Sequence, residues 1–569
     1  MTRSTTLSWP TERDLPAVSA VRGSVGTSAQ VKFPPGEGVL AIPVAPGIDG
    51  EEIQPRHTTV DAALRYGIDL AEYAERRGFS GTSGAVLTVD LPLVHGSIAE
   101  QLPWQGLAST ILLVGIGQGE PSDLRRAGSA IAQAAVGRGT VVATLGAGLD
   151  RAAATATRAL VEGYLAGCYT VPRGAGDGAA QPANAARLGL SGADSQGGRR
   201  TRGEGRHRPR GDEEQRHGEL ILLGKYDAGA IADGQRTARA TWLTRDLANI
   251  PGNVKTPERL AAWIARLGAA AALDVEVWEP ERLRAEGFGA LLGVGGGSAY
   301  GPRLAVVRYA PEGARRHAVL VGKGVTFDTG GLNLKPRAAM ETMKTDMAGA
   351  AAAFAAVRSA ADAGLAVRVT AVLPLAENAF GGASMRPDDV LTAYGGQRVE
   401  VGNTDAEGRL ILADALAWTD AVLEPDAVVD VATLTGAARI GLGTGMAALF
   451  ANRDGLARVL SDAGAAAGEP VWRLPLAPDY RAATASAVAD RGATGRGADP
   501  SHPFTGAGAV TAALFLEAFV GRRAWAHLDI AGPARADKDR LGVTRGATGF
   551  GAALLVRALE ALAQSWPDG

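Results

Sequence analysis

The sequence predicts an α/β protein of two domains, each built on a mostly parallel sheet that helices cover. Its 569 residues exceed what one ordinary hydrophobic core accommodates, so two or more domains are expected. In both halves of the chain, short β-like runs alternate with longer helix-like runs, which is the pattern of βαβ units. We expect an N-terminal domain over residues 1–225, a linker helix over 226–240 and a C-terminal domain over 241–569.

The N-terminal half carries structural elements but no chemistry of its own. Residues 1–30 are polar and weakly patterned, and we expect a loose lead-in there. Gly115, Gly117 and Gly119 follow a predicted strand, but Glu120 breaks the spacing of a dinucleotide-binding loop, so a tight strand-to-helix turn is favoured. Strands are expected at 39–44, 84–93, 109–114 and 140–145, and a helix at 60–77.

Residues 191–218 are rich in arginine and glycine and have no apolar period, so they cannot contribute to a core. Arginine runs occur in nucleic-acid-binding arms, but this one lacks interleaved aromatic residues and ends in Asp212-Glu213-Glu214. A disordered, solvated insert is therefore favoured over a nucleic-acid arm. The net charge of −2 likewise gives no general attraction to nucleic acid or to an anionic membrane.

The C-terminal half repeats the alternation of strands and helices. Thr256-Pro257-Glu258 has the form of a helix start with proline at the first helical position. Residues 293–298 are expected to form a glycine-rich turn. After a strand at 219–223, which belongs to the expected N-terminal domain, strands are expected at 305–309, 318–322, 366–375, 399–402, 427–433 and 524–530. Helices are expected at 234–247, 257–268, 348–363, 407–423 and 509–519.

Composition excludes several classes of protein. Hydrophobic residues make up 46% of the chain and charged residues 21%, which is typical of soluble globular proteins. The single cysteine, Cys168, excludes an internal disulfide framework and fits a reducing compartment. The N-terminus lacks the apolar core of a signal peptide, and no run approaches the roughly 20 apolar residues of a membrane helix. A cytoplasmic protein without membrane contact is expected.

Charged side chains gather in two glycine-rich stretches, residues 322–331 and 403–410, and in the segment between them. Because ligands of parallel sheets bind beyond the carboxyl ends of the strands, and these stretches follow predicted strands, we expect the charged groups to meet at one edge. Unpaired charges are costly at such places unless they bind a metal or each other. The residues are Lys323, Asp328, Lys335, Asp346, Asp405, Glu407 and Arg409.

A network of salt bridges would explain any one of these residues alone. The four carboxylates together are better explained by two divalent cations about 3.5–4 Å apart, between which a water molecule becomes hydroxide near neutral pH. The chain has 7 histidines, none in a His-Glu-x-x-His arrangement and none in either stretch. An oxygen-rich site for Mn, Zn, Mg or Co is therefore expected instead of a His-ligated zinc site.

The motifs around these residues are specific. They are Gly322 to Gly331, Leu334-Lys335-Pro336, Met343 to Met347 and, most specific of all, the octapeptide Asn403-Thr404-Asp405-Ala406-Glu407-Gly408-Arg409-Leu410. Over about residues 235–560 the sequence resembles the leucyl aminopeptidase (cytosol aminopeptidase) family. The resemblance implies a smaller, macro-like N-terminal α/β domain. It also implies a zinc-peptidase-like α/β/α catalytic domain with a mixed, mostly parallel sheet.

The resemblance assigns a metal role to five residues. Asp328 and Glu407 would bridge two divalent ions, Mn²⁺ or Zn²⁺ with Mg²⁺ or Co²⁺ as other candidates. Lys323 and Asp346 would complete one ion, and Asp405 the other. As a ligand Lys323 must be uncharged, and two adjacent dications would lower its pKa strongly.

The remaining roles concern the substrate. Lys335 would stay cationic and face the carbonyl oxygen that becomes negative, and Arg409 would hold a bicarbonate ion that acts as general base. Asp388 stands where the family has glycine in a turn, which leaves the geometry of that turn open. The substrate would be bordered by Met343, Asn403, Thr433, Leu434 and Gly436.

The implied function is a metal-dependent aminopeptidase. A hydroxide bridged by two metal ions would remove N-terminal residues from peptides, with leucine and other apolar residues preferred, and the free α-amine would bind a metal. The family forms hexamers, so a homohexamer is expected. The alternative is an aminopeptidase fold with an additional DNA-binding or regulatory role, which only the basic tract at 199–216 would support.

Overall fold

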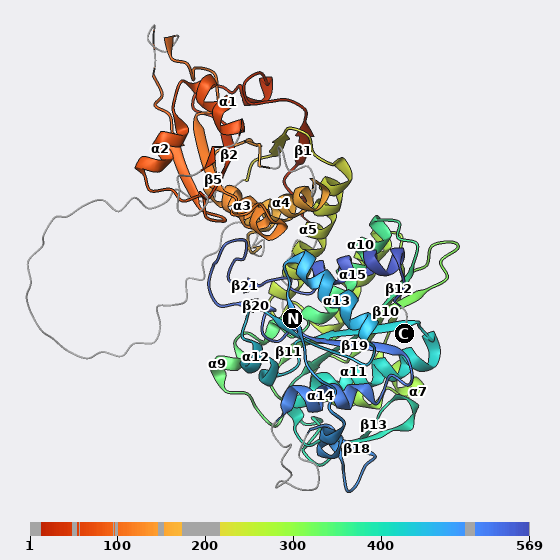
Figure 1. Ribbon diagram of the computed structural model, residues 1–569. Coiled ribbons are helices and arrows are strands. Elements are labelled where there is room, and N and C mark those ends of the chain that lie inside the picture. Colours follow the sequence, from red (N-terminus) through yellow and green to blue (C-terminus); the bar gives the residue numbers. More distant parts are fainter. Residues whose placement is uncertain are drawn as a thin grey trace, which may run out of the picture.

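The computed structural model describes residues 13–47, 54–55, 57–94, 96, 101–145, 153–172, 217–494 and 507–567. Two α/β domains are joined by the long helix α5 (Ala228–Asn249), which runs from the smaller N-terminal domain into the larger C-terminal one (Figure 1). The predicted α/β class with two domains is confirmed. The linker expected at 226–240 falls on the first part of α5. Apart from its last two residues, the insert at 191–218 lies outside the described residues.

The N-terminal sheet has the strand order β1-β7-β6-β2-β5-β4, with β3 beside β2. Its pairs are parallel except β4 with β5 and β3 with β2. The strands are β1 (Val18–Val21), β2 (Val39–Ala45), β3 (Gln54–Pro55), β4 (Val86–Asp90), β5 (Thr110–Gly115), β6 (Val141–Ala143) and β7 (Leu220–Leu223).

Helices cover both faces of this sheet. Helices α1 (His57–Tyr66) and α2 (Leu70–Arg76) contribute to the core on one face, and α3 (Pro121–Ala134), α4 (Ala153–Gly167) and the start of α5 to the core on the other. Helices α3 and α4 approach closely because glycines face each other. A Cβ at Gly128 would lie 2.3 Å from the carbonyl oxygen of Leu160, and one at Gly163 2.0 Å from that of Arg125.

Two expectations for the N-terminal domain are wrong, and one is confirmed. Residues 18–21 lie within the expected lead-in but form strand β1, because they pair with β7 from far along the chain. The helix expected over 60–77 is two helices, since Gly67 adopts a φ of +66° and Asp69 caps α2 by accepting from the backbone of Glu72. The strand-to-helix turn after Gly115 is present between β5 and α3.

The C-terminal sheet has the order β17-β16-β19-β15-β10-β12-β9-β8, with β11 paired in parallel to β12. The central strands β19, β15, β10 and β12 are parallel, and β16 and β9 run antiparallel to their inner neighbours. The strands are β8 (Asp274–Trp278), β9 (Arg303–Tyr309), β10 (His317–Gly322), β11 (Gly324–Asp328), β12 (Arg368–Asn378), β15 (Ala427–Ala432), β16 (Ala447–Ala451), β17 (Val471–Arg473) and β19 (Ala524–Asp529).

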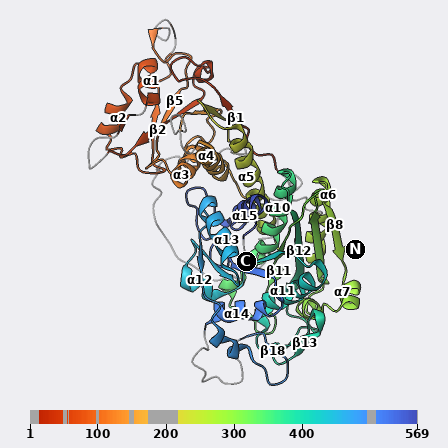
Figure 2. The ribbon, with the colours of Figure 1, turned by 45° about the vertical axis from the view of Figure 1, so that its right-hand side comes forward.

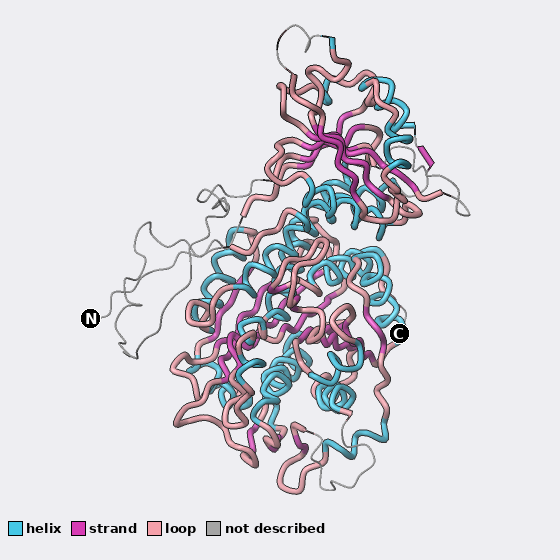
Figure 3. The backbone as a smooth tube through the Cα atoms, turned by 90° about the vertical axis from the view of Figure 1, so that its left-hand side faces the viewer, coloured by secondary structure: helices cyan, strands magenta, loops and turns pink. Residues whose placement is uncertain are grey.

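Two helical layers enclose this sheet, which lies between them (Figure 3). One layer contains α5, α6 (Pro257–Ala270), α10 (Ala348–Asp362), α13 (Asp454–Ala467) and α15 (Ala552–Gln564). The opposite layer contains α7 (Pro280–Glu286), α8 (Gly289–Gly295), α11 (Glu407–Trp418) and α14 (Gly508–Glu517). The predicted start of α6 is confirmed, because Thr256 caps it and Pro257 is its first residue.

Three local expectations for this domain need correction. Residues 324–328 form strand β11, which is not among the expected strands. The strand expected at 399–402 is β14 (Arg398–Glu400) of a separate small sheet with β13 (Val390–Thr392) and β18 (Arg491–Gly492), because its hydrogen bonds go to these strands. Residues 293–295 belong to α8, and the glycine-rich turn begins only after them. The turn at Asp388 does require a left-handed residue, with a φ of +72°.

The two domains are also joined by ion pairs between α4 and α15. Arg158 Nη1 lies 2.7 Å from Glu560 Oε2, and Arg557 Nη2 lies 2.8 Å from Glu162 Oε1. Figure 2 shows these helices on either side of the domain boundary, next to α5. Among the helices of the described ranges, none combines the length and the apolar character that crossing a membrane requires.

Candidate metal centre

The candidate site lies where several chain segments meet beyond the carboxyl ends of the central strands. Lys323 follows β10 directly, and Asp328 is the last residue of β11. Asp346 ends the short helix η3 (Met343–Thr345) just before α10, whereas Glu407 is the first residue of α11. Thr433 follows β15, the parallel neighbour of β10, so its loop reaches the same edge.

Lys323 is buried between two carboxylates. Its Nζ lies 2.8 Å from Asp346 Oδ2 and 2.9 Å from Glu407 Oε1, and it donates to the carbonyl oxygen of Thr433 over 2.9 Å. The side chain of Thr433 donates in turn to Asp346 Oδ1 over 2.7 Å. A Cβ at Gly408 would lie 2.5 Å from Lys323 Cε, so a larger residue there would displace the amine from its present position.

Lys335 lies between the two other carboxylates. Its Nζ is 2.7 Å from Asp328 Oδ2 and 2.5 Å from Asp405 Oδ1. The segment that carries Asp405 is held against the first glycine-rich stretch through Thr404. The hydroxyl of Thr404 donates to the carbonyl oxygen of Gly330 over 2.6 Å, and its amide donates to Asn333 Oδ1 over 2.8 Å. These bonds bring together two stretches that the main sheet does not connect.

Asn378 is a buried residue of the site that the sequence did not reveal. At the end of β12 its side-chain amide donates to Asp328 Oδ1 over 2.8 Å and to the carbonyl oxygen of Thr404 over 3.1 Å. A weaker contact of 3.5 Å reaches Glu407 Oε2. A polar residue at the carboxyl end of a predicted central strand was the available signal. The expected strand ended at residue 375 and stopped short of it.

Burial and mutual repulsion control the protonation of the carboxylates. Burial raises the pKa of Glu407 to about 8, and the neighbouring Asp328 carboxylate acts in the same direction. Burial also raises the pKa of Asp346, to about 6, against the opposing influence of Lys323. At neutral pH this site therefore holds its negative charge only where positive charge accompanies it.

The carboxylates also control the protonation of the two lysines. Burial works to lower the pKa of Lys323, but the carboxylates of Asp346 and Glu407 outweigh burial and raise it. The lowered pKa expected for this lysine concerns the site with two cations bound and stays a prediction. The pKa of Lys335 is raised as well, by Asp328 and Glu407 against burial.

The donor set fits divalent cations. Oxygen atoms of Asp328, Asp405 and Glu407 lie within 4.8 Å of one another, close enough to share one ion. Each ammonium group already lies between two carboxylates, which marks two positions where positive charge is stabilised. Carboxylate oxygens with one amine suit Mn²⁺, Mg²⁺ or Zn²⁺, and histidine is not needed. The residues would therefore hold the two ions that the sequence predicts.

All twelve predicted site residues line one cavity of about 450 Å³. The candidate ligands and Lys335 lie beside an apolar border that includes Met343, Leu434, Ala437, Ala531 and Ala534. The twelve are Lys323, Asp328, Lys335, Met343, Asn403, Asp346, Asp405, Glu407, Arg409, Thr433, Leu434 and Gly436. Their individual roles stay predictions.

Arg409 is buried in the wall of this cavity. Its Nη1 donates to the carbonyl oxygen of Ala493 over 2.7 Å, whereas its Nε has no hydrogen-bond partner within the described part of the chain. Burial lowers the pKa of the guanidinium to about 10, against the influence of Glu407. A buried cation with an unused donor is suited to hold an anion.

Asp529 orders the loop that borders the apolar side of the cavity. Its Oδ1 accepts from the backbone of Leu434 and of Ala531, each over 3.1 Å. Its Oδ2 accepts from the backbone of Thr435 over 3.0 Å and from its hydroxyl over 2.6 Å. The sequence predicted a strand over 524–530 but indicated no role for Asp529.

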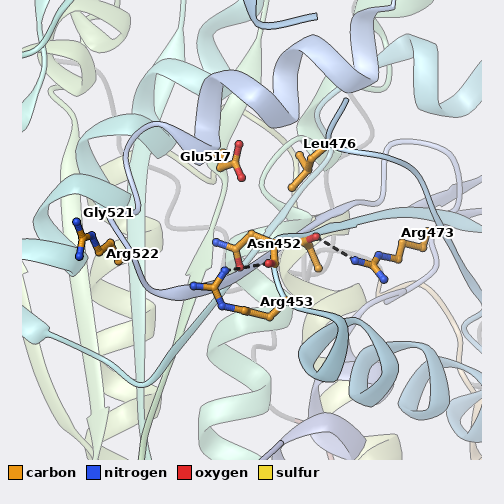
Figure 4. A pocket seen from close by; sticks show the side chains of 8 residues that line it. Asn452, Arg453, Arg473, Leu476, Glu517, Gly521 and Arg522 are labelled. Atoms are coloured by element: carbon orange, nitrogen blue, oxygen red, sulfur yellow. Dashed lines mark hydrogen bonds between the residues drawn. The ribbon is translucent and has the colours of Figure 1, made fainter. Parts of the chain in front are cut away.

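A larger cavity, of about 550 Å³, lies elsewhere and lacks such chemistry (Figure 4). It opens where β16 ends, and β16 runs antiparallel to β19, so this is the opposite edge of the sheet. Arg453 and Arg473 donate there to backbone carbonyl oxygens. Its carboxylate, Glu517, pairs with Arg481 over 2.7 Å. Size alone therefore does not mark the functional site.

Comparison with known proteins agrees with this geometry. Residues 242–556 match the catalytic domain of the cytosol aminopeptidase family, and residues 49–173 match the N-terminal domain of that family. The chain belongs to the cytosol aminopeptidase family. Its fold and its family are those of an aminopeptidase, as the motifs predicted.

Relatives of this cytosol aminopeptidase family member span most of the chain. A probable cytosol aminopeptidase of Streptomyces coelicolor is 38% identical over 535 residues, which are 92% of this chain and 95% of the relative. One from Leifsonia xyli subsp. xyli is 48% identical over 360 residues, 61% of this chain and 70% of the relative.

Solved structures of similar proteins show the same fold. The bottromycin maturation enzyme BotP in complex with Mn aligns with a TM-score of 0.73 at 33% identity, over 92% of this chain and 99% of BotP. A tomato leucine aminopeptidase variant aligns with a TM-score of 0.75 at 27% identity, over 98% of this chain and 99% of the tomato protein.

Proposed function

We propose that this protein is a metal-dependent aminopeptidase that removes leucine and other apolar residues from the N-terminus of peptides. The observation that carries the proposal is that five candidate metal ligands, a cationic lysine and an apolar border line one cavity. Asp328, Asp346, Asp405, Glu407 and Lys323 would hold two divalent cations. When bound, these cations would supply a polarised carbonyl group and a water molecule of lowered pKa.

Lys335 and Arg409 supply the remaining charges. The ammonium of Lys335 is held cationic by Asp328 and Asp405 and lines the cavity, so it would stabilise the negative charge that develops on the scissile carbonyl oxygen. The unused Nε–H of Arg409 supports an anion at this wall, and we propose bicarbonate, which would accept a proton during attack.

The apolar border supports the preference for apolar N-terminal residues. Met343, Leu434 and Ala437 offer no charge to a substrate side chain, and burying an apolar side chain against them is worth roughly 1.5–3 kcal/mol. A free α-amine would find the carboxylates within the same cavity. Cleavage is therefore expected to be confined to the first residue of the peptide.

Hydrolysis of aminoacyl-anilides tests the proposal. Protein stripped of metal by a chelator should be inactive, and Mn²⁺, Zn²⁺, Mg²⁺ or Co²⁺ should restore cleavage to different degrees. Leucyl-anilide should be cleaved faster than glutamyl-anilide, and N-acetyl-leucyl-anilide should resist cleavage. A correctly folded protein that is inactive with every metal would refute the proposal.

Single variants test the ligand set. Asp328→Ala and Glu407→Ala should each abolish leucyl-anilide cleavage. Lys344→Ala should keep most of it, because Lys344 donates to the carbonyl oxygen of Asn249 and does not line the cavity. Equal losses at all three positions would contradict the assignment.

For Arg409, activity in carbonate-depleted buffer should fall and recover on addition of bicarbonate.

The proposal extends to assembly and location. We propose a cytoplasmic homohexamer, which family membership supports. Light scattering of the purified protein tests the assembly, and a monomer at cellular concentration would contradict it.

A further inference from the structure

A second cavity of about 310 Å³ lies between the two domains and is separate from the metal centre. Side chains of α3, α4 and α5 line it from one side. From the other side it is lined by the loop before α15 and by the segment 540–543. Its volume is within the usual range of small-molecule sites. Nothing in the proposed reaction uses this space.

Arg245 of α5 contributes a buried positive charge to the cavity. It is 1% exposed, and within the described ranges no carboxylate lies close enough to form an ion pair with it. Its Nε donates to the carbonyl oxygen of Ala547 over 3.1 Å, and its Nη2 donates to Thr544 Oγ1 over 2.6 Å. The guanidinium lies 3.6 Å from the ring centroid of Tyr169. Buried cations are costly unless an anion accompanies them.

Other arginines of the lining add to this charge. Arg125 pairs with Glu162 over 3.0 Å, yet its Nε is buried without a hydrogen-bond partner in the described structure. Arg126 and Arg540 are exposed at the cavity and form no ion pair with any described residue. Four arginines therefore face this space.

The carboxylates of the lining are already engaged. Glu162 is shared by three arginines, namely Arg125, Arg158 and Arg557. Glu469 Oε2 accepts from the backbone of Gly551 and of Leu554, over 3.0 Å and 2.7 Å, at the start of α15. Neither acid is available to neutralise Arg245, Arg126 or Arg540. The cavity consequently has an excess of positive charge.

The rest of the lining combines hydroxyl-bearing side chains with apolar ones, among which are Trp242, Leu541, Val543 and Phe550. Positive charge beside aromatic and aliphatic surface fits a ligand with an anionic head and an apolar body. We propose that this interdomain cavity binds a small organic carboxylate of that kind. The inference goes beyond the proposed peptidase function, because it assigns a second ligand site.

One short segment connects this cavity to the catalytic one. Pro533 lines the interdomain cavity, whereas Ala531, Ala534 and Arg535 line the catalytic cavity. Thr548, in the interdomain lining, donates its hydroxyl to the carbonyl oxygen of Pro533 over 2.7 Å and its amide to that of Ala534. A carboxylate bound beside Pro533 would therefore lie next to the wall of the catalytic cavity, and we expect its binding to change the KM for the peptide substrate.

Calorimetric titration of the full-length protein with 4-phenylbutyrate tests the site directly. The neutral amide of the same compound is the matched ligand, and it should bind about tenfold or more weakly, since it lacks the charge. The double variant Arg126→Ala/Arg540→Ala should also lose about tenfold or more in affinity for the carboxylate. Both arginines are exposed, so the variant should fold.

The matched control is Arg453→Ala/Arg522→Ala, which removes two exposed arginines of the opposite-edge cavity and should bind 4-phenylbutyrate as the wild type does. In wild-type protein 4-phenylbutyrate should change the KM for leucyl-anilide, and in the Arg126→Ala/Arg540→Ala variant it should not. Absence of wild-type binding, or equal binding by both double variants, would overturn the proposal. Binding is measured without turnover, so this result is independent of whether the peptidase proposal holds.

Discussion

The side-chain amide of Asn378 donates to Asp328 Oδ1 over 2.8 Å and so fixes which oxygen of that carboxylate remains for Lys335. The same amide reaches the carbonyl oxygen of Thr404, so one side chain from β12 links both glycine-rich stretches. Partners of this kind orient metal ligands without contacting the metal. Asn378 therefore belongs to the candidate site as much as the charged residues do.

Replacing Asn378 with alanine should weaken metal binding. Asp328 and the carbonyl oxygen of Thr404 would each lose a buried donor, and loss of such a partner reduces metal affinity by about 10–100-fold. Calorimetric titration of Mn²⁺ into chelator-treated protein measures the change. Asn253→Ala, which alters an exposed asparagine, should bind Mn²⁺ like the wild type. Equal Mn²⁺ affinity in all three proteins would contradict a supporting role.

Replacing Lys335 with alanine should affect turnover and leave metal binding intact. The lysine lies against Asp328 and Asp405, so its removal takes away a competing cation and no ligand. If its ammonium stabilises the developing negative charge, kcat for leucyl-anilide should fall by about 10²–10³-fold with little change in KM. Steady-state kinetics at saturating Mn²⁺ tests this. A loss of Mn²⁺ affinity comparable with that of Asn378→Ala would show that Lys335 acts otherwise.

The charged residues of the site were predictable, because charged side chains in a glycine-rich stretch after a predicted strand usually bind a metal or pair with each other. Asn378 and Asp529 were not, since a lone asparagine or aspartate at a strand end also occurs as an ordinary cap or turn residue. The pairing of each lysine with two carboxylates was not predictable either, because the sequence does not give the distances on which it depends.

Long periodic elements of the fold were predictable, but sheet membership was not. The helices α6 and α10 and the strands β10 and β15 coincide closely with the expected ranges, because local pattern and burial agree there. Strand β14 was expected from its local sequence, yet it pairs in the small sheet with β13 and β18 and not in the main sheet. Strand β1 depends on a partner far along the chain. Such long-range pairing leaves no local signal.

Ionisation of the Asp414 carboxyl group should make the folded protein less stable as the pH rises. It is fully buried on α11 and accepts from the backbone of Leu291 and of Tyr394, each over 2.8 Å. Burial raises its pKa from 3.8 to about 7. The unfolded chain releases this proton first, so the stabilisation from the protonated form is complete below pH 3.8 and is lost as the pH approaches 7.

Asp414→Asn removes this titration while keeping an acceptor oxygen. Urea unfolding across the same pH window should give a flatter pH dependence for the variant than for the wild type. Across this pH window the change in the free energy of unfolding should differ between the two proteins by a few kcal/mol at most, at about 1.4 kcal/mol for each pH unit. Parallel curves for the two proteins would show that this carboxyl group titrates normally in the folded state.

Asp529→Asn should alter substrate preference through the loop that borders the cavity. Asp529 accepts four hydrogen bonds, from Leu434, from Ala531 and twice from Thr435, and an amide would turn an N–H group toward some of these donors. The free energy of unfolding should fall by about 1–3 kcal/mol. Because Leu434 borders the apolar side, KM should rise more for leucyl-anilide than for alanyl-anilide.

The ratio of these two KM values separates positioning from general destabilisation. A variant that is merely less stable keeps the wild-type ratio at temperatures where it is folded, whereas a displaced Leu434 loses contacts that only the larger side chain makes. Asp274→Asn is the matched control, since it makes the same chemical change at an exposed position 3.2 Å from Arg308, away from the cavity. If Asp529→Asn keeps the wild-type ratio, Asp529 supports the fold and does not position the substrate.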